Sequence, residues 1–149
     1  MRKSLILDAL LTLGTAAQAQ LPGLRKRGPQ EQQQPVLQGI DALRADFAAQ
    51  SGGTTVYFGA ENVGLTVPAR TVLSAQANWL RRHPEVVVRI EGYGDAGDTR
   101  DHALAVGARR AEEARSYLVL LGVPAAQLSA TSWGKERPGL GRAVTVLVR

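Results

Sequence analysis

The sequence contains no cysteine among its 149 residues. A chain without cysteine forms no disulfide, offers no thiol nucleophile and cannot carry a lipid on an N-terminal cysteine. Histidine is almost as rare, and the two histidines, His83 and His102, are too few and too far apart in the sequence to predict a metal site. We therefore predict a protein without disulfides, metal or other cofactor, whose stability comes from its packed core.

Aromatic residues are also scarce, and the excess of positive charge is small. Seven aromatic side chains and a formal net charge of +5, spread over scattered basic residues, do not indicate a nucleic-acid-binding surface. The sequence has no evident Ser-His-Asp arrangement or pair of catalytic carboxylates, and Gly92-Tyr93-Gly94 lacks the third glycine of a dinucleotide-binding loop. We predict neither an enzyme nor a nucleic-acid-binding protein. A mildly basic surface would suit an anionic wall polymer.

Residues 1–19 have the pattern of a secretory signal peptide. Arg2-Lys3 precedes a short apolar run from Leu5 to Leu13, which Asp8 interrupts, and Ala17-Gln18-Ala19 matches a cleavage site. The run is too short to span a bilayer. We therefore predict export to the periplasm with cleavage after Ala19. An uncleaved anchor and a cytosolic product are the alternatives.

Three further segments follow the predicted signal. Residues 20–35 are rich in glutamine, proline and basic residues, which is typical of a flexible linker. In residues 36–50, apolar side chains recur at spacings of three and four and predict an amphipathic helix: Val36, Ile40, Leu43 and Phe47. This helix either packs on the following domain or offers its apolar face to a partner. Residues 54–149 are predicted to form one domain.

The pattern of residues 54–149 predicts an α+β fold in the order β-α-β-α-β-β. We expect strands over 54–58, 86–91, 128–133 and 143–148, and helices over 66–82 and 100–121. Pro84 should end the first of these helices and Gly122 the second. The expected buried face of the second helix consists of Leu104, Gly107, Ala111, Ala114, Leu118 and Leu121. The result would be a small mixed sheet covered on one face by two helices.

An aspartate follows the second predicted strand, and an arginine lies fifteen positions later on the next helix. The stretches are IEGYGD, ending at Asp95, and LAVGARRA, in which the second arginine is Arg110. A carboxylate and a guanidinium at one mouth suit a zwitterionic ligand, because the acid accepts from an ammonium and the arginine can bind a carboxylate with two hydrogen bonds. Together with the segments 56–58, 117–123, 133–138 and 142–146, these stretches resemble the OmpA-like peptidoglycan-binding domain family over residues 54–149.

The resemblance implies noncovalent binding of peptidoglycan through the diaminopimelate of its stem peptide. Asp95 matches the family's aspartate that binds the ammonium, and Arg110 matches its arginine that binds a carboxylate. Backbone N–H groups near the helix start, around residues 99–101, would assist. The candidates for supporting roles are Thr99, Arg100, His102 and Arg142. Such a protein would tether an envelope component to the cell wall and would be associated with the wall or the outer membrane. An outer-membrane or other envelope protein would hold it through the helix from Val36 to Phe47.

Several positions depart from the family's pattern. The family's histidine before the binding loop is Tyr93, a loop glycine is Asp98, and an asparagine in the first turn of the helix is Ala103. The negative charge of Asp98 would repel ligand carboxylates. The family's Phe-Asp-Phe-Asp pattern near the first strand has become Phe58-Gly59-Ala60-Glu61, and the loop before the last strand, residues 139–141, is short.

These departures support a second hypothesis. The chain would be a degenerate OmpA-like domain that serves as a protein-interaction or structural subunit of an envelope complex without wall binding. Asp95 would then cap a loop and Arg110 would pair with Glu113 on the same helix. An open cleft faced by both side chains would indicate binding. A direct buried ion pair between them, or a cleft blocked by Tyr93, would favour the second hypothesis.

Overall fold

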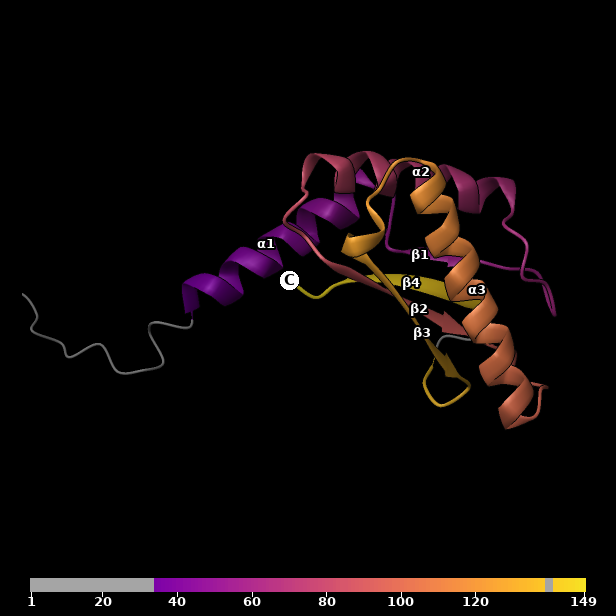
Figure 1. Ribbon diagram of the computed structural model, residues 1–149. Helices are drawn as coiled ribbons and strands as arrows, with labels where there is room; N and C mark the ends of the chain where they lie inside the picture. Colours follow the sequence, from indigo (N-terminus) through magenta and orange to yellow (C-terminus); the bar gives the residue numbers. More distant parts are fainter. Residues whose placement is uncertain (1–33, 139–140) are drawn as a thin grey trace, which may run out of the picture.

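Helices pack on one face of a four-stranded sheet (Figure 1). The computed structural model describes residues 34–138 and 141–149, so the predicted signal peptide, residues 20–33 of the predicted linker and residues 139–140 lie outside it. The elements are α1 (Gln34–Gln50), β1 (Thr55–Tyr57), α2 (Val67–Arg82), β2 (Val88–Tyr93), α3 (Arg100–Leu120), the 3-10 helix η1 (Ala125–Gln127), β3 (Leu128–Gly134) and β4 (Arg142–Leu147).

The sheet has the strand order β1-β4-β2-β3. Strands β2 and β3 are parallel, whereas β4 pairs antiparallel with both β1 and β2. Helix α3 makes the connection that the parallel pair requires, because two parallel neighbours cannot be joined by a tight turn. The predicted α+β class and mixed sheet are therefore confirmed. None of the helices in the described part of the chain has the length and apolar character needed to cross a bilayer.

The ends of α2 follow from local chemistry. Thr66 caps its start by accepting a hydrogen bond from the Ala69 N–H group at 3.2 Å. At its end, His83 stacks on Trp79 and precedes Pro84. The strand expected from Val86 begins only at Val88, because the Val86 N–H group donates to the carbonyl of His83 in the turn that follows the helix.

Helix α1 packs on the rest of the domain through its apolar face. Phe47 is fully buried and meets Trp79 edge to face with a centroid distance of 5.1 Å, and Ile40 and Leu43 pack against the same core. The Trp79 indole N–H group donates to the Asp46 carboxylate at 2.7 Å. Of the two alternatives for this helix, the structure has the one in which it packs back on the domain.

The buried face of α3 differs from the expected one. Leu104 is 47% exposed, while Ala103, Val106 and Arg110 lie on the inner face with Gly107 and Ala111. The prediction for Leu104 was wrong because the pattern of apolar residues excluded an arginine from the buried stripe. The helix lies close to β2, since a Cβ atom on Gly92 would overlap the carbonyl group of Gly107. This close approach brings Arg110 next to the end of β2.

Candidate ligand-binding site at the start of helix α3

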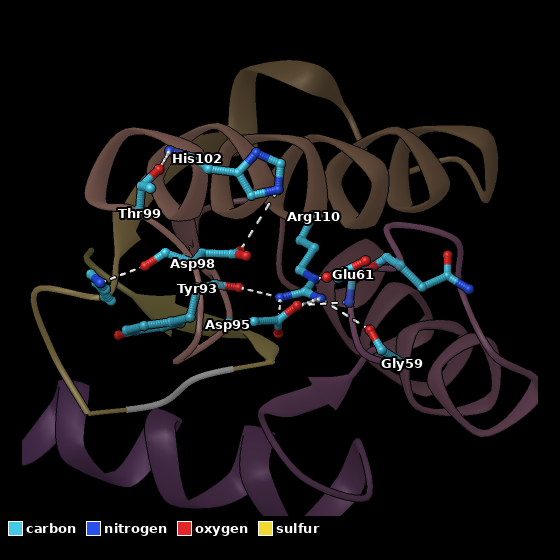
Figure 2. A network of polar contacts seen from close by, with 10 residues as sticks. Gly59, Glu61, Tyr93, Asp95, Asp98, Thr99, His102 and Arg110 are labelled. Carbon is cyan, nitrogen blue, oxygen red and sulfur yellow. Dashed lines mark hydrogen bonds and ion pairs between the residues drawn. The ribbon is translucent and has the colours of Figure 1, made fainter.

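Asp95 and Arg110 form a direct ion pair. Asp95 follows the carboxyl end of β2, and Arg110 lies on the inner face of α3. The two guanidinium nitrogens Nη1 and Nη2 donate to Oδ1 and Oδ2 of Asp95 at 2.9 and 3.1 Å (Figure 2). This is the two-pronged geometry that makes arginine–carboxylate pairs both strong and directional.

Arg110 uses all of its hydrogen-bond donors within the protein. Besides its two bonds to Asp95, Nη1 donates to the carbonyl oxygen of Tyr93 at 2.8 Å, and Nη2 donates to that of Gly59 at 3.0 Å. Nε donates to the carbonyl oxygen of Asn62 at 2.9 Å. A guanidinium has five N–H groups, so none is left for a ligand in this arrangement. The side chain is also fully buried.

Asp95 is the partner that solvent can reach. Its side chain is 20% exposed, against 0% for Arg110. The hydrogen bonds from Arg110 hold the pKa of Asp95 below its usual range, the Glu61 N–H group and the charge of His102 act in the same direction, and partial burial opposes them. The carboxylate therefore remains ionised at neutral pH. Oδ2 accepts from both Arg110 and Glu61, whereas Oδ1 accepts only from Arg110 among the described residues.

The segment 59–62 completes this site through its backbone. Gly59 and Asn62 supply carbonyl oxygens to Arg110, and the Glu61 N–H group donates to Asp95 at 2.7 Å. Glu61 adopts a positive φ of 54° to do so. In the sequence, this segment is recognisable only as an eroded form of the family's Phe-Asp-Phe-Asp pattern. The sequence does not reveal these contacts, because they use main-chain atoms, which are the same for every residue type.

Asp98 lies three residues after Asp95 in the same loop. Its N–H group donates to the Asp95 carbonyl oxygen at 3.4 Å. Its side chain is 12% exposed, and its Oδ2 atom is buried without a hydrogen-bond partner. The Nε2 atom of His102 lies 3.8 Å from Oδ2 of this carboxylate. Lys135 donates to the backbone carbonyl of Asp98 instead.

The other candidates have different surroundings. Thr99 caps α3 by accepting from the His102 N–H group at 3.3 Å. Arg100 is mostly exposed and pairs with Glu136 at 2.6 Å. Arg142 has its guanidinium 5.6 Å from the centre of the Tyr93 ring. The structure thus brings Asp95, Arg110 and His102 together, while Thr99 caps the helix and Arg100 and Arg142 have other partners.

Tyr93 does not lie over the ion pair. Its hydroxyl donates to the carboxylate of Glu91 at 3.1 Å, and Figure 2 shows its ring pointing away from the Arg110 guanidinium. Glu113, the alternative partner for Arg110, is exposed, and Arg110 pairs with Asp95 instead. Residues 34–138 and 141–149 contain no group of three acidic or histidine side chains that could hold a metal ion.

Comparisons with known proteins agree with this fold. The model of the OmpA family matches residues 57–144. Proteins named peptidoglycan-associated lipoprotein are 38% identical over 86 residues in Agrobacterium fabrum and 40% identical over 99 residues in Pseudomonas aeruginosa. These matches cover 58% and 66% of this chain, and 49% and 58% of those proteins. The chain thus spans about half the length of the curated relatives it matches.

Solved structures give the same result. The peptidoglycan-associated lipoprotein from Burkholderia pseudomallei is 34% identical and superposes with a TM-score of 0.62, over 64% of this chain and 91% of that one. A putative MotB-like protein from Desulfovibrio vulgaris has a TM-score of 0.65, over 79% of this chain and 99% of that one. It is only 21% identical, so its likeness shows the fold alone.

Proposed function

Because this chain belongs to the OmpA family, we propose that it binds peptidoglycan noncovalently, through the diaminopimelate of the stem peptide. Relatives that are 38 to 40% identical carry the name peptidoglycan-associated lipoprotein, which supports a role at the cell wall. The proposal includes a location in the periplasm and the tethering of an envelope component to the wall. Binding of this kind needs no catalytic group.

The observation that carries the proposal is the state of Asp95. A carboxylate that is ionised, fixed by a buried arginine and partly open to solvent is suited to accept an ammonium group. Oδ1 has capacity for a further donor, since Arg110 provides the only hydrogen bond that it accepts from the described residues. We therefore assign Asp95 the contact with the free amine of diaminopimelate.

Arg110 receives a positioning role in this proposal. Its five N–H groups all donate to Asp95 or to three main-chain carbonyl groups. Arg110 therefore acts on the ligand indirectly, because it keeps the Asp95 carboxylate in position and ionised. The prediction that Arg110 also binds a ligand carboxylate stays a prediction. It requires one of the present hydrogen bonds to be exchanged for a bond to the ligand.

A partner that anchors the protein would have to bind a surface other than the apolar face of α1. The apolar face of α1 is already covered at Ile40, Leu43 and Phe47. The outer side of this helix remains available, with the exposed residues Asp41, Ala42 and Ala45. We therefore propose that a partner binds the solvent-exposed side of α1.

A second function is favoured by the direct ion pair itself. An arginine whose donors all serve the protein can be a purely structural element, and the fold would then be a protein-interaction or structural subunit without wall binding. In that case, replacing Asp95 would change the stability of the domain and nothing else. The two functions differ in whether the folded parent protein binds peptidoglycan at all.

Co-sedimentation with sacculi of the diaminopimelate type tests the proposal. We expect the purified chain to pellet with the sacculi, and Asp95→Asn to stay in solution while keeping the parent's circular dichroism spectrum. Glu113→Gln is the matched control, because it removes one negative charge from an exposed position of the same helix. It should pellet like the parent. A folded parent that stays in solution would show that the second function is the right one.

A further inference from the structure

Strand β1 has one free edge. It is the outermost strand on its side of the sheet and pairs only with β4 (Figure 1). Thr54 and Phe58, which flank it, each form a backbone hydrogen bond of 2.8 Å with β4 or with the residue before β4. Because backbone groups in an antiparallel pair point to the two sides alternately, the N–H and carbonyl groups of Thr55 and Tyr57 point away from β4. Within residues 34–138 and 141–149, no hydrogen bond reaches these outward groups.

This edge has little protection against a further strand. Proteins protect exposed edges with charged side chains, proline, a bulge or a very short strand, and of these β1 has only its length of three residues. Residues 51–60 and 62–69 contain no charged side chain, although 21% of the chain is charged. At the opposite edge of the sheet, by contrast, Arg115 of α3 donates to the Leu128 carbonyl oxygen of β3 at 3.4 Å. The β1 edge is therefore the one that is open to pairing.

A groove of about 220 Å³ lies between β1 and the start of α2. Val56 and Tyr57 line it from the strand, and Pro68 and Val72 line it from the helix. Tyr57 is 64% exposed, an unusual exposure for a large aromatic side chain. A strand added at this edge would cover apolar surface as well as pair with the free backbone groups.

The edge is complementary to a second copy of itself. An antiparallel pair with a two-fold axis at Val56 places Thr55 opposite Tyr57 of the second copy, and Tyr57 opposite Thr55 of the second copy. The two outward N–H groups of each strand then face the outward carbonyl groups of the other. An aromatic residue opposite a β-branched one is a favourable cross-strand pair. The chain carries a net charge of +5, so two copies repel each other in general, and an uncharged contact adds nothing to that repulsion.

We propose that β1 pairs with β1 of a second copy of this chain, so that one continuous sheet runs through both domains. Because the shared strand is short, the contact is smaller than that of a permanent dimer, and the two copies associate only at high protein concentration. The pairing does not depend on the proposed function. If that function holds, the dimer presents two Asp95 sites to a repetitive polymer, which raises its avidity.

Sedimentation equilibrium of the full chain tests the proposal. We expect the average mass to rise from 15.9 kDa towards twice that value as the protein concentration is raised to about 1 mM, which populates even a dimer with a dissociation constant of that order. Thr55→Pro removes an N–H group that points away from β4, and Tyr57→Lys places a charge at the contact. Both should remain monomeric with the parent's circular dichroism spectrum. Leu120→Lys adds the same charge at an exposed apolar position of α3, which is 78% exposed, and should associate like the parent.

Amide hydrogen exchange at several protein concentrations locates the contact. The N–H groups of Thr55 and Tyr57 should exchange more slowly as the concentration rises, whereas that of Val56, which faces β4, is protected throughout. A chain that stays monomeric up to the highest concentration overturns the proposal. So does a dimer that both edge variants retain, or one in which Thr55 and Tyr57 exchange as fast as in the monomer. Each of these results leaves the binding of peptidoglycan to be decided by co-sedimentation.

Discussion

Arg110 joins three segments that are far apart in the sequence: residues 59–62, the end of β2 and helix α3. It reaches the first through the carbonyl groups of Gly59 and Asn62, and the second through Tyr93 and Asp95. Because the side chain is fully buried, its charge depends on these acceptors for compensation. The residue that defines the site is thus also a part of the core.

Replacement of Arg110 should therefore destabilise the domain. Arg110→Met leaves Asp95 without its arginine partner and removes the bonds that Arg110 donates to three carbonyl groups, of which that of Gly59 keeps the Asn62 N–H group as a donor. We expect a loss of about 3–5 kcal/mol in the free energy of unfolding. The neighbouring Arg109 is exposed, so Arg109→Met should change it by less than about 0.5 kcal/mol. Urea denaturation of both variants measures the difference. Equal stability of the two variants would show that the buried network is not structural.

Asp95 should make the stability of the protein sensitive to acid. Its pKa in the folded state is lowered, above all by the hydrogen bonds from Arg110, relative to about 3.9 in an unfolded chain. A lowered pKa stabilises the fold above the unfolded value, and this contribution disappears as the pH falls through the folded value. We expect urea midpoints to fall from pH 5 towards pH 3, and to fall less steeply in Asp95→Asn. Parallel curves for the two proteins would contradict the assignment.

The identities of the site residues could be predicted from the sequence, but their environment could not. The family pattern singles out Asp95 and Arg110 by their positions after a strand and along a helix. Nothing in the sequence shows that Arg110 is fully satisfied, because three of its five acceptors are main-chain carbonyl groups. Likewise, Asp98 reads as a loop acid in the sequence, and only the structure shows that its Oδ2 atom is buried without a partner.

At the level of elements, the close packing of α3 on β2 depends on two facing glycines. A Cβ atom on Gly107 would lie 2.8 Å from the carbonyl oxygen of Gly92 and would also overlap the hydroxyl of Ser132. Because Arg110 lies one turn after Gly107, the distance between helix and strand sets the geometry of the ion pair. Gly92 and Gly107 therefore set the geometry of the site, although they contribute no side chain to it.

Gly107→Ala should push α3 away from the sheet. We expect a loss of about 1–3 kcal/mol, the usual cost of forcing an extra methyl group into a packed contact, even though alanine is the better helix former. It should also weaken co-sedimentation with sacculi, because Arg110 and Asp95 separate. Gly39→Ala is the matched control, since Gly39 also lies on a helix and a Cβ atom there meets nothing within 4 Å. An unchanged melting temperature in Gly107→Ala would show that the helix adjusts freely.

The elements themselves were predictable where local chemistry decides them. Thr66 as a cap, Pro84 after His83 and Gly122 with its positive φ of 92° mark helix ends in the sequence as well as in the structure. The predictions failed where tertiary contacts decide. Val86 falls in a turn because its N–H group bonds to His83, and η1 has no periodic pattern that would predict it.

On the scale of the whole molecule, α1 and the domain are held together by contacts from several elements. Arg44 donates to the Leu147 carbonyl oxygen of β4 at 3.2 Å, and Arg82 of α2 donates to Gln50 at 2.9 Å. Gln76 reaches the carbonyl oxygen of Gly53, directly after the helix, at 3.1 Å. These bonds, together with the packing of Phe47, make α1 an integral part of the fold, and we expect a single cooperative unfolding transition for the described part of the chain.

Phe47→Ala tests this unity. Phe47 is fully buried against Trp79, so its truncation should lower the free energy of unfolding by about 3–5 kcal/mol. If α1 belongs to the cooperative unit, helix content by circular dichroism and tryptophan fluorescence shift together to a lower denaturant concentration, with one transition each. Trp79 contacts α1 and Trp133 lies on β3, so fluorescence reports on both parts.

Tyr57→Ala, at a position that is 64% exposed, is the aromatic control and should cost less than about 1 kcal/mol. An early loss of helix that leaves the main fluorescence transition in place would show instead that α1 is a separable arm, which could then leave the domain to bind a partner with its apolar face.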